Sequence, residues 1–418
     1  MRILIATAGS YGDVAPYCGL GARLRRAGHE VSLATHERFA EVVRRAGLGF
    51  GPLPVDPREV LASHRGQRLL KARARTLEAV EIARIGRAVL PALGAGVLEA
   101  AEQGTDLLLL STSTAPPGRV VAEALGVPSM GLYLQPLAPT GDFPPAVLGI
   151  RPLGRYGNRA AGAATRVALD RLFAPAVRTL RAELGLPPLG GAAQRRREDR
   201  TRWPVLHGVS PTVLPRPADW RPGLEVGGYW WPHPDPGWRP EPRLVDFLAS
   251  GPPPVFVGFG SLVVADAERL GAVVREALRR AGLRGVVQAG WTGLSAEGDD
   301  MLAVDEVPHH WLFPRTAAVV HHGGAGTTAA GLRAGVPSVP VPAQLDAGFW
   351  AARLTALGVS PGAVPLRALR ADRLAGALRA AVERPGFGQR ARALAARIGA
   401  EDGAAAVLAA VERAGGGR

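Results

Sequence analysis

Residues 321–328 read HHGGAGTT and stand between the apolar run Ala317–Val320 and an alanine-rich run. The apolar run predicts a buried strand and the alanine-rich run a helix. Glycines between a strand and a helix let a ligand approach the backbone, and the first amides of the helix are unpaired donors at the positive end of its dipole. The turn therefore suits a phosphate, with His322 and Thr327 as further donors. A tight turn with a capping threonine is the alternative.

Two more glycine turns follow predicted strands. The first turn is Gly258-Phe259-Gly260-Ser261, at the end of the predicted strand Val255–Gly258. The second turn is Gly9–Val14, which follows the predicted strand Ile3–Ala6. Ligands of open α/β sheets bind beyond the carboxyl ends of the strands, so the two turns in the second half can converge on one diphosphate. In the first half, Asp13 falls at the start of a helix. It is either an N-terminal cap or a general base that faces a cleft between the halves.

Strand-like and helical runs alternate along the chain, which predicts parallel sheets wound on both faces. The predicted strands are Ile3–Ala6, Val31–Ala34, Leu107–Leu110, Ser129–Leu132, Val255–Gly258, Val286–Ala289, Ala317–Val320 and Ser338–Val341. Residues 68–103 predict a long arginine-rich helix broken near Pro91. Gly190–Arg202 predicts a mobile, solvated loop.

Prolines concentrate between residues 211 and 242. So many prolines cannot form a central helix or strand, and the segment predicts a linker between two α/β halves. The expected division is an N-terminal half over 1–214, a proline-rich linker over 215–240, a C-terminal half over 241–395 and a last helix over 396–418.

The composition excludes several classes of protein. A chain of 418 residues with 47% hydrophobic residues predicts two or three globular domains. One cysteine, Cys18, excludes a disulfide framework. No apolar run approaches the ~20 residues of a membrane helix, and the first residues predict a strand rather than a signal peptide, so we expect a cytoplasmic location. The formal charge is +14, but the arginines are dispersed, which argues against a nucleic-acid partner.

A nicotinamide-binding site, a serine hydrolase triad and a metal site fit the sequence less well than a phosphate-binding turn. A nicotinamide enzyme would need Gly-x-Gly-x-x-Gly, of which Gly9 and Gly12 supply half. Residues 358–362 match the hydrolase pattern Gly-x-Ser-x-Gly, but no histidine follows His322 to complete a triad. The four histidines between 309 and 322 lack the carboxylate or cysteine spacing of a metal site, so no metal is expected.

Motifs along nearly the whole chain resemble the family 1 nucleotide-sugar glycosyltransferases of the two-Rossmann (GT-B) type. The likeness is greatest to bacterial antibiotic glycosyltransferases and sterol glucosyltransferases. The motifs are Gly9–Pro16, Ala34-Thr35-His36, Val255–Ser261, Val307–Pro314, His321–Thr328 and Arg333–Pro337. The resemblance implies an α/β fold with two facing Rossmann-like domains, parallel sheets and an interdomain cleft. The N-terminal domain would bind the acceptor and the C-terminal domain the donor, and the last helix would cross back to the first domain.

The resemblance also implies the site residues, with Asp13 as the catalytic base. The residues expected to bind the donor are Ser10, Gly12, Ser261, Trp291, Val307, His309, His322, Gly324, Gly326, Thr327, Gln344 and Asp346. Trp291 packs by the nucleotide or, equally, belongs to the core or a lid. Asp346 matches a sugar contact, but Ala347 follows where the family often has glutamine. The loss of the glutamine side chain disfavours glucose as the donor sugar and favours a deoxysugar, unless Gln344 replaces the missing contacts.

The implied reaction is a metal-independent, inverting transfer of a sugar from a UDP- or dTDP-sugar to a hydroxyl of a lipophilic small molecule. A polyketide, macrolide, peptide or sterol fits as acceptor. No cofactor or metal is expected, in keeping with the absence of any Asp-x-Asp motif from the sequence. The alternative is a nucleotide-sugar-binding protein without transfer activity, which Ala347 favours and Asp13 and Asp346 oppose. No pattern in the sequence predicts an oligomeric state.

Overall fold

The chain forms two compact units. The computed structural model describes residues 1–63, 66, 75–149, 151–264, 266–294, 298, 300–343 and 345–416. Unit 1 comprises Met1–Pro145, Pro152–Asp235 and Asp402–Arg418, and unit 2 comprises Ala146–Arg151 and Pro236–Glu401.

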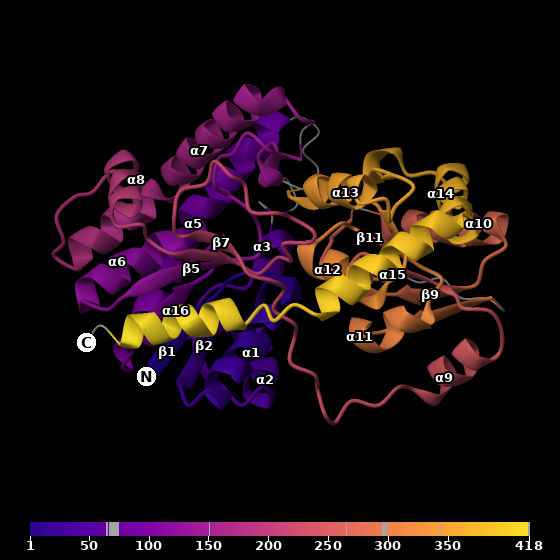
Figure 1. Cartoon of the computed structure of the whole chain (residues 1–418), viewed down its shortest axis with the longest axis horizontal. Coiled ribbons are helices and arrows are strands. Elements are labelled where there is room, and N and C mark those ends of the chain that lie inside the picture. Colours follow the sequence, from indigo (N-terminus) through magenta and orange to yellow (C-terminus); the bar gives the residue numbers. More distant parts are fainter. Residues whose placement is uncertain are drawn as a thin grey trace. The chain divides into compact units, whose positions relative to one another are not determined.

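Unit 1 is built, in its described part, on a parallel sheet of seven strands in the order β3-β2-β1-β4-β5-β6-β7 (Figure 1). The strands are β1 (Arg2–Ala6), β2 (Glu30–His36), β3 (Gly49–Leu53), β4 (Leu107–Leu110), β5 (Ser129–Tyr133), β6 (Val205–His207) and β7 (Leu224–Val226). The helices are α1 (Tyr11–Arg26), α2 (Ala40–Arg45), α3 (Pro57–Ala62), α5 (Arg75–Glu102), α6 (Ala115–Leu125), α7 (Gly154–Glu183), α8 (Gly191–Arg200) and α16 (Ala405–Gly415).

Successive side chains of β1 point into two different cores, as the period of two in a strand requires. Ile3 and Ile5 pack with residues of α1, α2 and α16, whereas Leu4 and Ala6 pack with residues of α5, α6 and α7. The central strand β4 is fully buried, which explains its four consecutive leucines. The predicted α/β architecture with parallel sheets is confirmed.

Unit 2 has, in its described part, a parallel sheet of five strands in the order β10-β9-β8-β11-β12. The strands are β8 (Val255–Gly258), β9 (Gly285–Gln288), β10 (Met301–Val304), β11 (Ala318–His321) and β12 (Ser338–Pro340). The helices are α9 (Pro242–Ala249), α10 (Ala267–Ala281), α11 (His309–Leu312), α12 (Ala325–Ala334), α13 (Ala347–Ala356), α14 (Ala371–Glu383) and α15 (Pro385–Gly399). Val255 and Val257 face α10 and α14, while Phe256 faces α9 and α11.

Each sheet reverses its strand order at one place. In unit 1 the reversal lies between β1 and β4, and in unit 2 between β8 and β11. Loops diverge on either side of such a point, which leaves a crevice at the carboxyl ends of the strands where α/β proteins bind ligands. The three glycine turns of the sequence follow β1, β8 and β11, so all three lie at a reversal.

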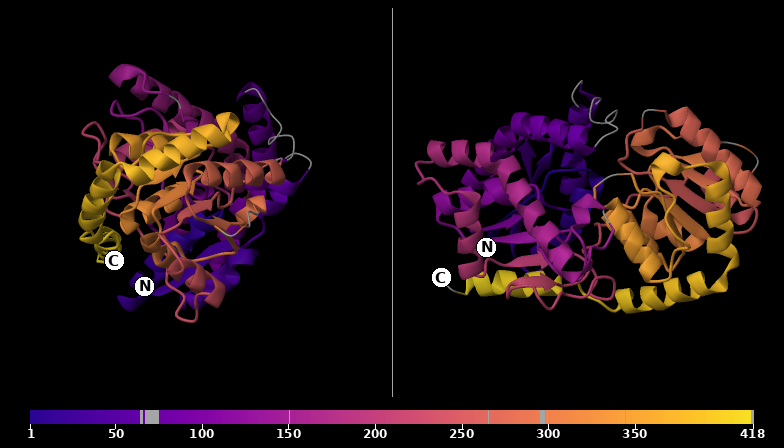
Figure 2. Two further views of the ribbon diagram at one scale, coloured as in Figure 1. Left: turned by 90° about the vertical axis from the view of Figure 1, so that its right-hand side faces the viewer. Right: turned by 90° about the horizontal axis from the view of Figure 1, so that it is seen from above.

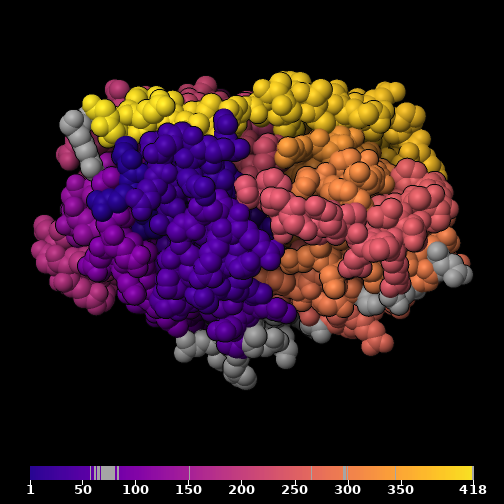
Figure 3. Space-filling view, turned by 90° about the horizontal axis from the view of Figure 1, so that it is seen from below, coloured from indigo at the N-terminus to yellow at the C-terminus, as the bar shows by residue number. Residues whose placement is uncertain are grey.

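Helix α16 belongs to unit 1, although unit 2 precedes it in the chain. Val407 and Val411 are fully buried in the same core as Ile3. The Trp230 indole donates a hydrogen bond to the carbonyl of Gly403 at 3.0 Å. Figure 3 shows α16 in yellow against the indigo N-terminal residues, and in both views of Figure 2 the end of α16 lies near the N-terminus. The expected boundary at residue 396 falls inside α15, and the chain returns to unit 1 only at Asp402.

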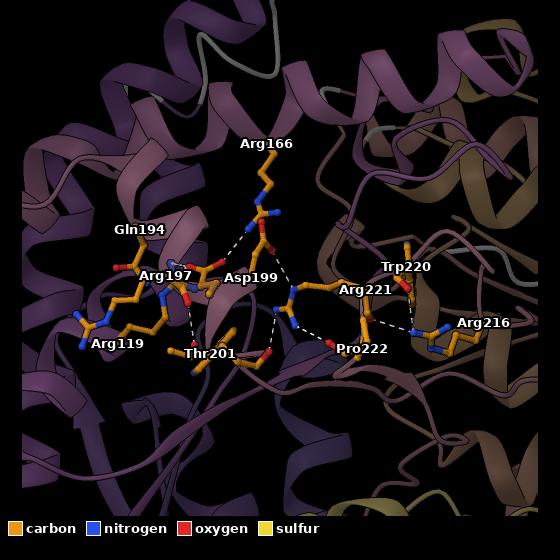
Figure 4. Close-up of polar contacts among 12 residues, drawn as sticks. Arg119, Arg166, Gln194, Arg197, Asp199, Thr201, Arg216, Trp220, Arg221 and Pro222 are labelled. Atoms are coloured by element: carbon orange, nitrogen blue, oxygen red, sulfur yellow. Dashed lines mark hydrogen bonds and ion pairs between the residues drawn. The ribbon is translucent and has the colours of Figure 1, made fainter.

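The predicted mobile loop Gly190–Arg202 is wrong, because this segment forms α8. Its charged residues join other helices (Figure 4). Glu198, only 7% exposed, accepts a hydrogen bond from Arg166 at 2.7 Å and forms an ion pair with Arg119 at 3.2 Å. Arg197 forms an ion pair with Glu123 at 2.8 Å. The charge run therefore anchors α8 to α6 and α7, where the sequence indicated solvation.

The break expected near Pro91 is also wrong. Helix α5 runs through Pro91 without a break, and the ring lies on an exposed face, where water can bond the carbonyl that loses its partner. The expected linker 215–240 does contain the passage from unit 1 to unit 2, between Asp235 and Pro236, but its earlier part forms β7, which pairs with β6. Strand β7 has three residues, none of them proline, and lies at the sheet edge, so the flanking prolines cost the ladder little.

We predict that Val411→Asp undocks α16, because it buries a charge without a partner. Amide hydrogen exchange over residues 405–415 should lose its protection in this variant. Ala405→Asp adds the same charge at an exposed position of the same helix and should keep the protection. Equal exchange in the two variants would contradict the docking described above.

Candidate active site

Asp13 lies in the first turn of α1, directly beyond β1. Its Oδ2 accepts hydrogen bonds from the backbone amide of Ser10 at 2.8 Å and from Ser10 Oγ at 3.0 Å. Ser10 is the N-cap residue, so the two residues form a capping box. Asp13 is therefore not the N-cap residue itself: it occupies the third helical position, and its carboxylate accepts the amide of the N-cap residue Ser10. Asp13 as a whole residue is partly exposed.

The surroundings of Asp13 change the pKa of its carboxyl. Burial raises the pKa of its carboxyl above the ordinary value, against hydrogen bonds from Ser10 and Gln135 that lower it. A carboxylate of raised pKa takes up a proton more readily, which is the property that a general base requires.

The loops around Asp13 are held by short polar contacts. The Gly9 amide donates to Nε2 of the buried His36 at 2.9 Å, and Ser113 Oγ, beyond β4, donates to the carbonyl of Ala8 at 2.8 Å. A Cβ atom at Gly9 would overlap the Asp13 carboxylate, so only glycine fits there. The turn after β1 is thus tied to β2 and to the loop after β4.

In unit 2, the His322 ring lies between the two glycine turns. His321, the last residue of β11, is in register with Gly258, the last of β8. A Cβ atom at Gly260 would lie 3.0 Å from Cε1 of His322, and one at Gly324 would overlap the same ring. The absence of side chains on both glycines is therefore what makes room for this imidazole. Ser261 follows Gly260 directly and shares this end of the sheet.

The turn after β8 is also joined to the loop after β9. The Trp291 amide donates to the carbonyl of Gly260 at 2.9 Å. Trp291 lies in the short helix η3 (Gly290–Thr292) and is half-buried. The structure therefore brings Ser261, Trp291 and His322, which the sequence singled out separately, to neighbouring loops. Val307 lies farther along, half-buried beside the core that contains Phe313.

Helix α12 begins immediately after His322 and Gly323 with Gly324 as its N-cap residue, and no side chain caps it. The amide of Thr328 is bonded to the carbonyl of Gly324 at 3.0 Å, as in a regular helix. The amides before it, including those of Gly326 and Thr327, have no partner within the helix. They form a set of donors at the positive end of the helix dipole, where an anion binds favourably.

Three histidines near this helix end are uncharged at neutral pH. Burial lowers the pKa of His309 and of His322 to about 4, and that of His321 to about 3. The His309 ring stacks on Phe313 with centroids 4.3 Å apart. A neutral imidazole still donates one N–H, so His322 can bond a phosphate oxygen as a donor without a charge. The His309 ring is held by this stacking and by an edge contact with Phe256 at 5.7 Å between centroids.

Asp346 precedes α13 as its N-cap residue. Its Oδ2 accepts a hydrogen bond from the Trp350 indole at 2.7 Å. Ala347 is buried, and a Cβ atom at Gly323 would lie 3.2 Å from its Cβ. The start of α13 is therefore packed on the turn that carries His322. The other residue expected near the sugar, Gln344, lies outside the described residues.

Two contributors to this geometry were missed from the sequence. Trp350 stands four residues after Asp346, a spacing that places side chains together at a helix start and could have indicated the pair. His36 was part of a motif, but nothing in the sequence showed that its ring accepts the Gly9 amide. Within the described ranges, no group of three or more His, Cys, Asp or Glu side chains is placed to hold a metal ion.

Two family models match the chain. The N-terminal domain of glycosyltransferase family 28 matches residues 3–139, and the C-terminal domain of erythromycin biosynthesis protein CIII-like proteins matches residues 289–413. The chain is 38% identical to O-mycaminosyltylonolide 6-deoxyallosyltransferase of Streptomyces fradiae, over 96% of this chain and 95% of that one. It is 33% identical to sterol 3-beta-glucosyltransferase UGT80B1 of Arabidopsis thaliana, over 99% and 68%. The chain is a GT-B glycosyltransferase.

Solved structures agree with this assignment. The glycosyltransferase SsfS6 of Streptomyces sp. SF2575, crystallised with thymidine diphosphate, matches 99% of each chain with 25% identity and a TM-score of 0.65. In the glycosyltransferase described here, the first family model contains Asp13 and the second contains Trp291, His322 and Asp346. Among the described residues, no helix is long and apolar enough to span a membrane.

We predict that acid destabilises this glycosyltransferase partly through His309. Its pKa is lowered from 6.5 to about 4 in the folded state, so below pH 6.5 the unfolded chain binds a proton that the folded one does not. Stability that is present above pH 6.5 is therefore lost as the pH falls toward 4. His309→Phe preserves a ring beside Phe313 and removes this titration. The drop in melting temperature from pH 7 to pH 5 should be smaller for the variant, and an equal drop would contradict the assignment.

Proposed function

We propose that this enzyme transfers a sugar from a UDP- or dTDP-sugar to a hydroxyl of a lipophilic small molecule, with inversion at the anomeric carbon and without a metal. The observation that carries the proposal is the convergence on His322 of two glycine turns and an uncapped helix end. It supplies hydrogen-bond donors for a diphosphate at the place where α/β sheets bind nucleotides.

The donor diphosphate would bind to the first turn of α12. The Gly326 and Thr327 amides and the Thr327 hydroxyl donate to the phosphate nearer the sugar, and His322 donates from beside it. Ser261 would contribute from the turn after β8, and Val307 and Trp291 would lie by the base. Either uridine or thymidine fits this scheme. The thymidine diphosphate complex of SsfS6 supports the second base.

Asp13 would act as the general base. The acceptor hydroxyl is a poor nucleophile at neutral pH, and loss of its proton to the carboxylate assists its attack. The new bond forms between the acceptor oxygen and the anomeric carbon while the bond from that carbon to the diphosphate oxygen breaks. Attack from the face opposite the leaving group inverts the configuration. The leaving diphosphate gains charge, which the α12 amides and His322 stabilise, and this removes the need for a metal ion.

The sugar would be a deoxysugar. Asp346 can bond a sugar hydroxyl, but Ala347 is buried and offers no polar group where the family often has glutamine. A sugar with fewer hydroxyls leaves fewer unpaired polar groups in such a site. The S. fradiae relative is named for transfer of a 6-deoxysugar to a macrolide, and the A. thaliana relative for transfer of glucose to a sterol. Both names support a lipophilic acceptor.

We predict that Asp13→Asn lowers kcat about a hundredfold or more, a typical loss for a general base, and leaves the Kd for dTDP and UDP unchanged. Turnover should be followed by product analysis with a panel of macrolide and sterol acceptors, with and without EDTA. Glu30→Gln removes an exposed carboxylate at the opposite end of the same sheet and should retain the activity. Undiminished turnover of Asp13→Asn would remove this residue from the mechanism, and loss of wild-type activity in EDTA would refute metal independence.

We predict that His322→Ala weakens the binding of dTDP or UDP about tenfold or more. A hydrogen bond to a charged group contributes roughly 1.5–3 kcal/mol, and every ~1.4 kcal/mol changes Kd tenfold. His310→Ala removes an exposed imidazole from the same region and serves as the control in calorimetry. Equal affinities of the two variants would argue against the contact. Donor binding by the wild type without transfer to any acceptor would favour the alternative, a nucleotide-sugar-binding protein.

A further inference from the structure

A short segment from the N-terminal half of the sequence packs inside unit 2. It consists of the 3-10 helix η2 (Ala146–Leu148) and Gly149, and it lies against the start of α13. A Cβ atom at Gly149 would be 3.3 Å from the carbonyl oxygen of Leu345, and one at Gly348 would be 3.1 Å from the Cα atom of Gly149. The two backbones therefore pass so close that a Cβ atom at either glycine would press on the other segment.

Leu345 has a backbone conformation that leucine rarely adopts. Its φ is 52°, in the left-handed region, and 61% of the residue is exposed. Such a conformation costs free energy and persists only where the surroundings impose it. The exposed side chain buries little surface to offset that cost. The close approach of Gly149 to its carbonyl is the contact that can hold the backbone of Leu345 in this region.

The next residue is Asp346, whose carboxylate is held at a second point. The indole that donates to its Oδ2 belongs to Trp350, which is 1% exposed and packs edge-on against Phe349 with centroids 5.0 Å apart. The position of the Asp346 carboxylate is therefore fixed from one side by a rigid buried ring. The position of this carboxylate also depends on the backbone conformation of Leu345, the residue that precedes Asp346 in the chain.

We propose that Gly149 and Leu345 are positioning residues for recognition of the donor sugar. Their backbone contact keeps Leu345 in the left-handed region, and this conformation aims the Asp346 carboxylate at a sugar hydroxyl. The inference rests on the proposed function, which assigns the sugar contact to Asp346. Because the diphosphate binds to α12, a disturbance of the contact should weaken the binding of the sugar moiety and spare that of the diphosphate.

The first test compares two glycines that both have positive φ. Gly149→Ala places a methyl group against Leu345. Gly154→Ala introduces similar backbone strain at a φ of 72°, but its methyl group would meet no atom within 4 Å. Only the first substitution should disturb Asp346, which separates the contact from the general cost of alanine at positive φ.

The second test changes Leu345 itself. Glycine adopts the left-handed region freely, whereas a β-branched residue strongly resists it. Leu345→Gly should therefore preserve the position of Asp346, and Leu345→Val should alter it. If the two variants behave alike, the leucine side chain rather than the backbone conformation matters, and the proposal is wrong.

Two measurements report the outcome. The indole N–H resonance of Trp350, assigned with Trp350→Phe, should shift in Gly149→Ala and Leu345→Val and stay in place in Gly154→Ala and Leu345→Gly. The ratio of the Kd for dTDP-6-deoxyglucose to the Kd for dTDP should rise at least fivefold in the first pair only. An unchanged resonance or an unchanged ratio in that pair overturns the proposal. If the wild type binds neither probe nor UDP, the proposed function fails instead, and the indole resonance still tests the contact.

Discussion

The candidate donor site depends on one constraint: at the strand-order reversal of unit 2, backbone segments must lie very close to the His322 ring and to each other. His322 can lie beside the start of α12 only because Gly260 and Gly324 have no side chains. Gly323 lets α13 pack on the same turn through Ala347. A side chain at any of these glycines would meet either the His322 ring or atoms of Ala347 at 3.2 Å or less. The glycines at these positions therefore allow an imidazole and several backbone amides to face one anion.

Most of the fold could be predicted from the sequence, because buried parallel strands leave a strong local pattern. Four consecutive leucines at 107–110 fit only a fully buried segment, and the glycine turns mark where strands end. The errors came from long-range partners. Glu198 indicates a solvated loop until Arg119 and Arg166 are brought to it by folding, and Pro91 indicates a break until its ring is seen on an exposed helix face. Such partners cannot be predicted from the neighbouring residues in the sequence.

The candidate site divides in the same way. Asp13, His322, Thr327 and Asp346 could be singled out because their residue types follow strand ends or begin helices. The capping box between Ser10 and Asp13 shows that a structural and a chemical interpretation of one carboxylate are compatible. What sequence could not supply was the support behind these residues. His36 accepts the Gly9 amide, and Ala347 packs on Gly323. Both contacts join strands and loops that are distant in the chain.

The placement of α16 has a consequence for synthesis of the protein. Unit 1 lacks one wall of its core until residues 405–415 have left the ribosome, after the whole of unit 2 has been made. Until then the surface that will meet Val407 and Val411 is uncovered, and so is the indole of Trp230 that later bonds Gly403. Unit 1 can therefore reach its final stability only after translation of these residues. A chain that stalls within α15 would leave the apolar residues that pack on α16 exposed, although all the strands described above are already present.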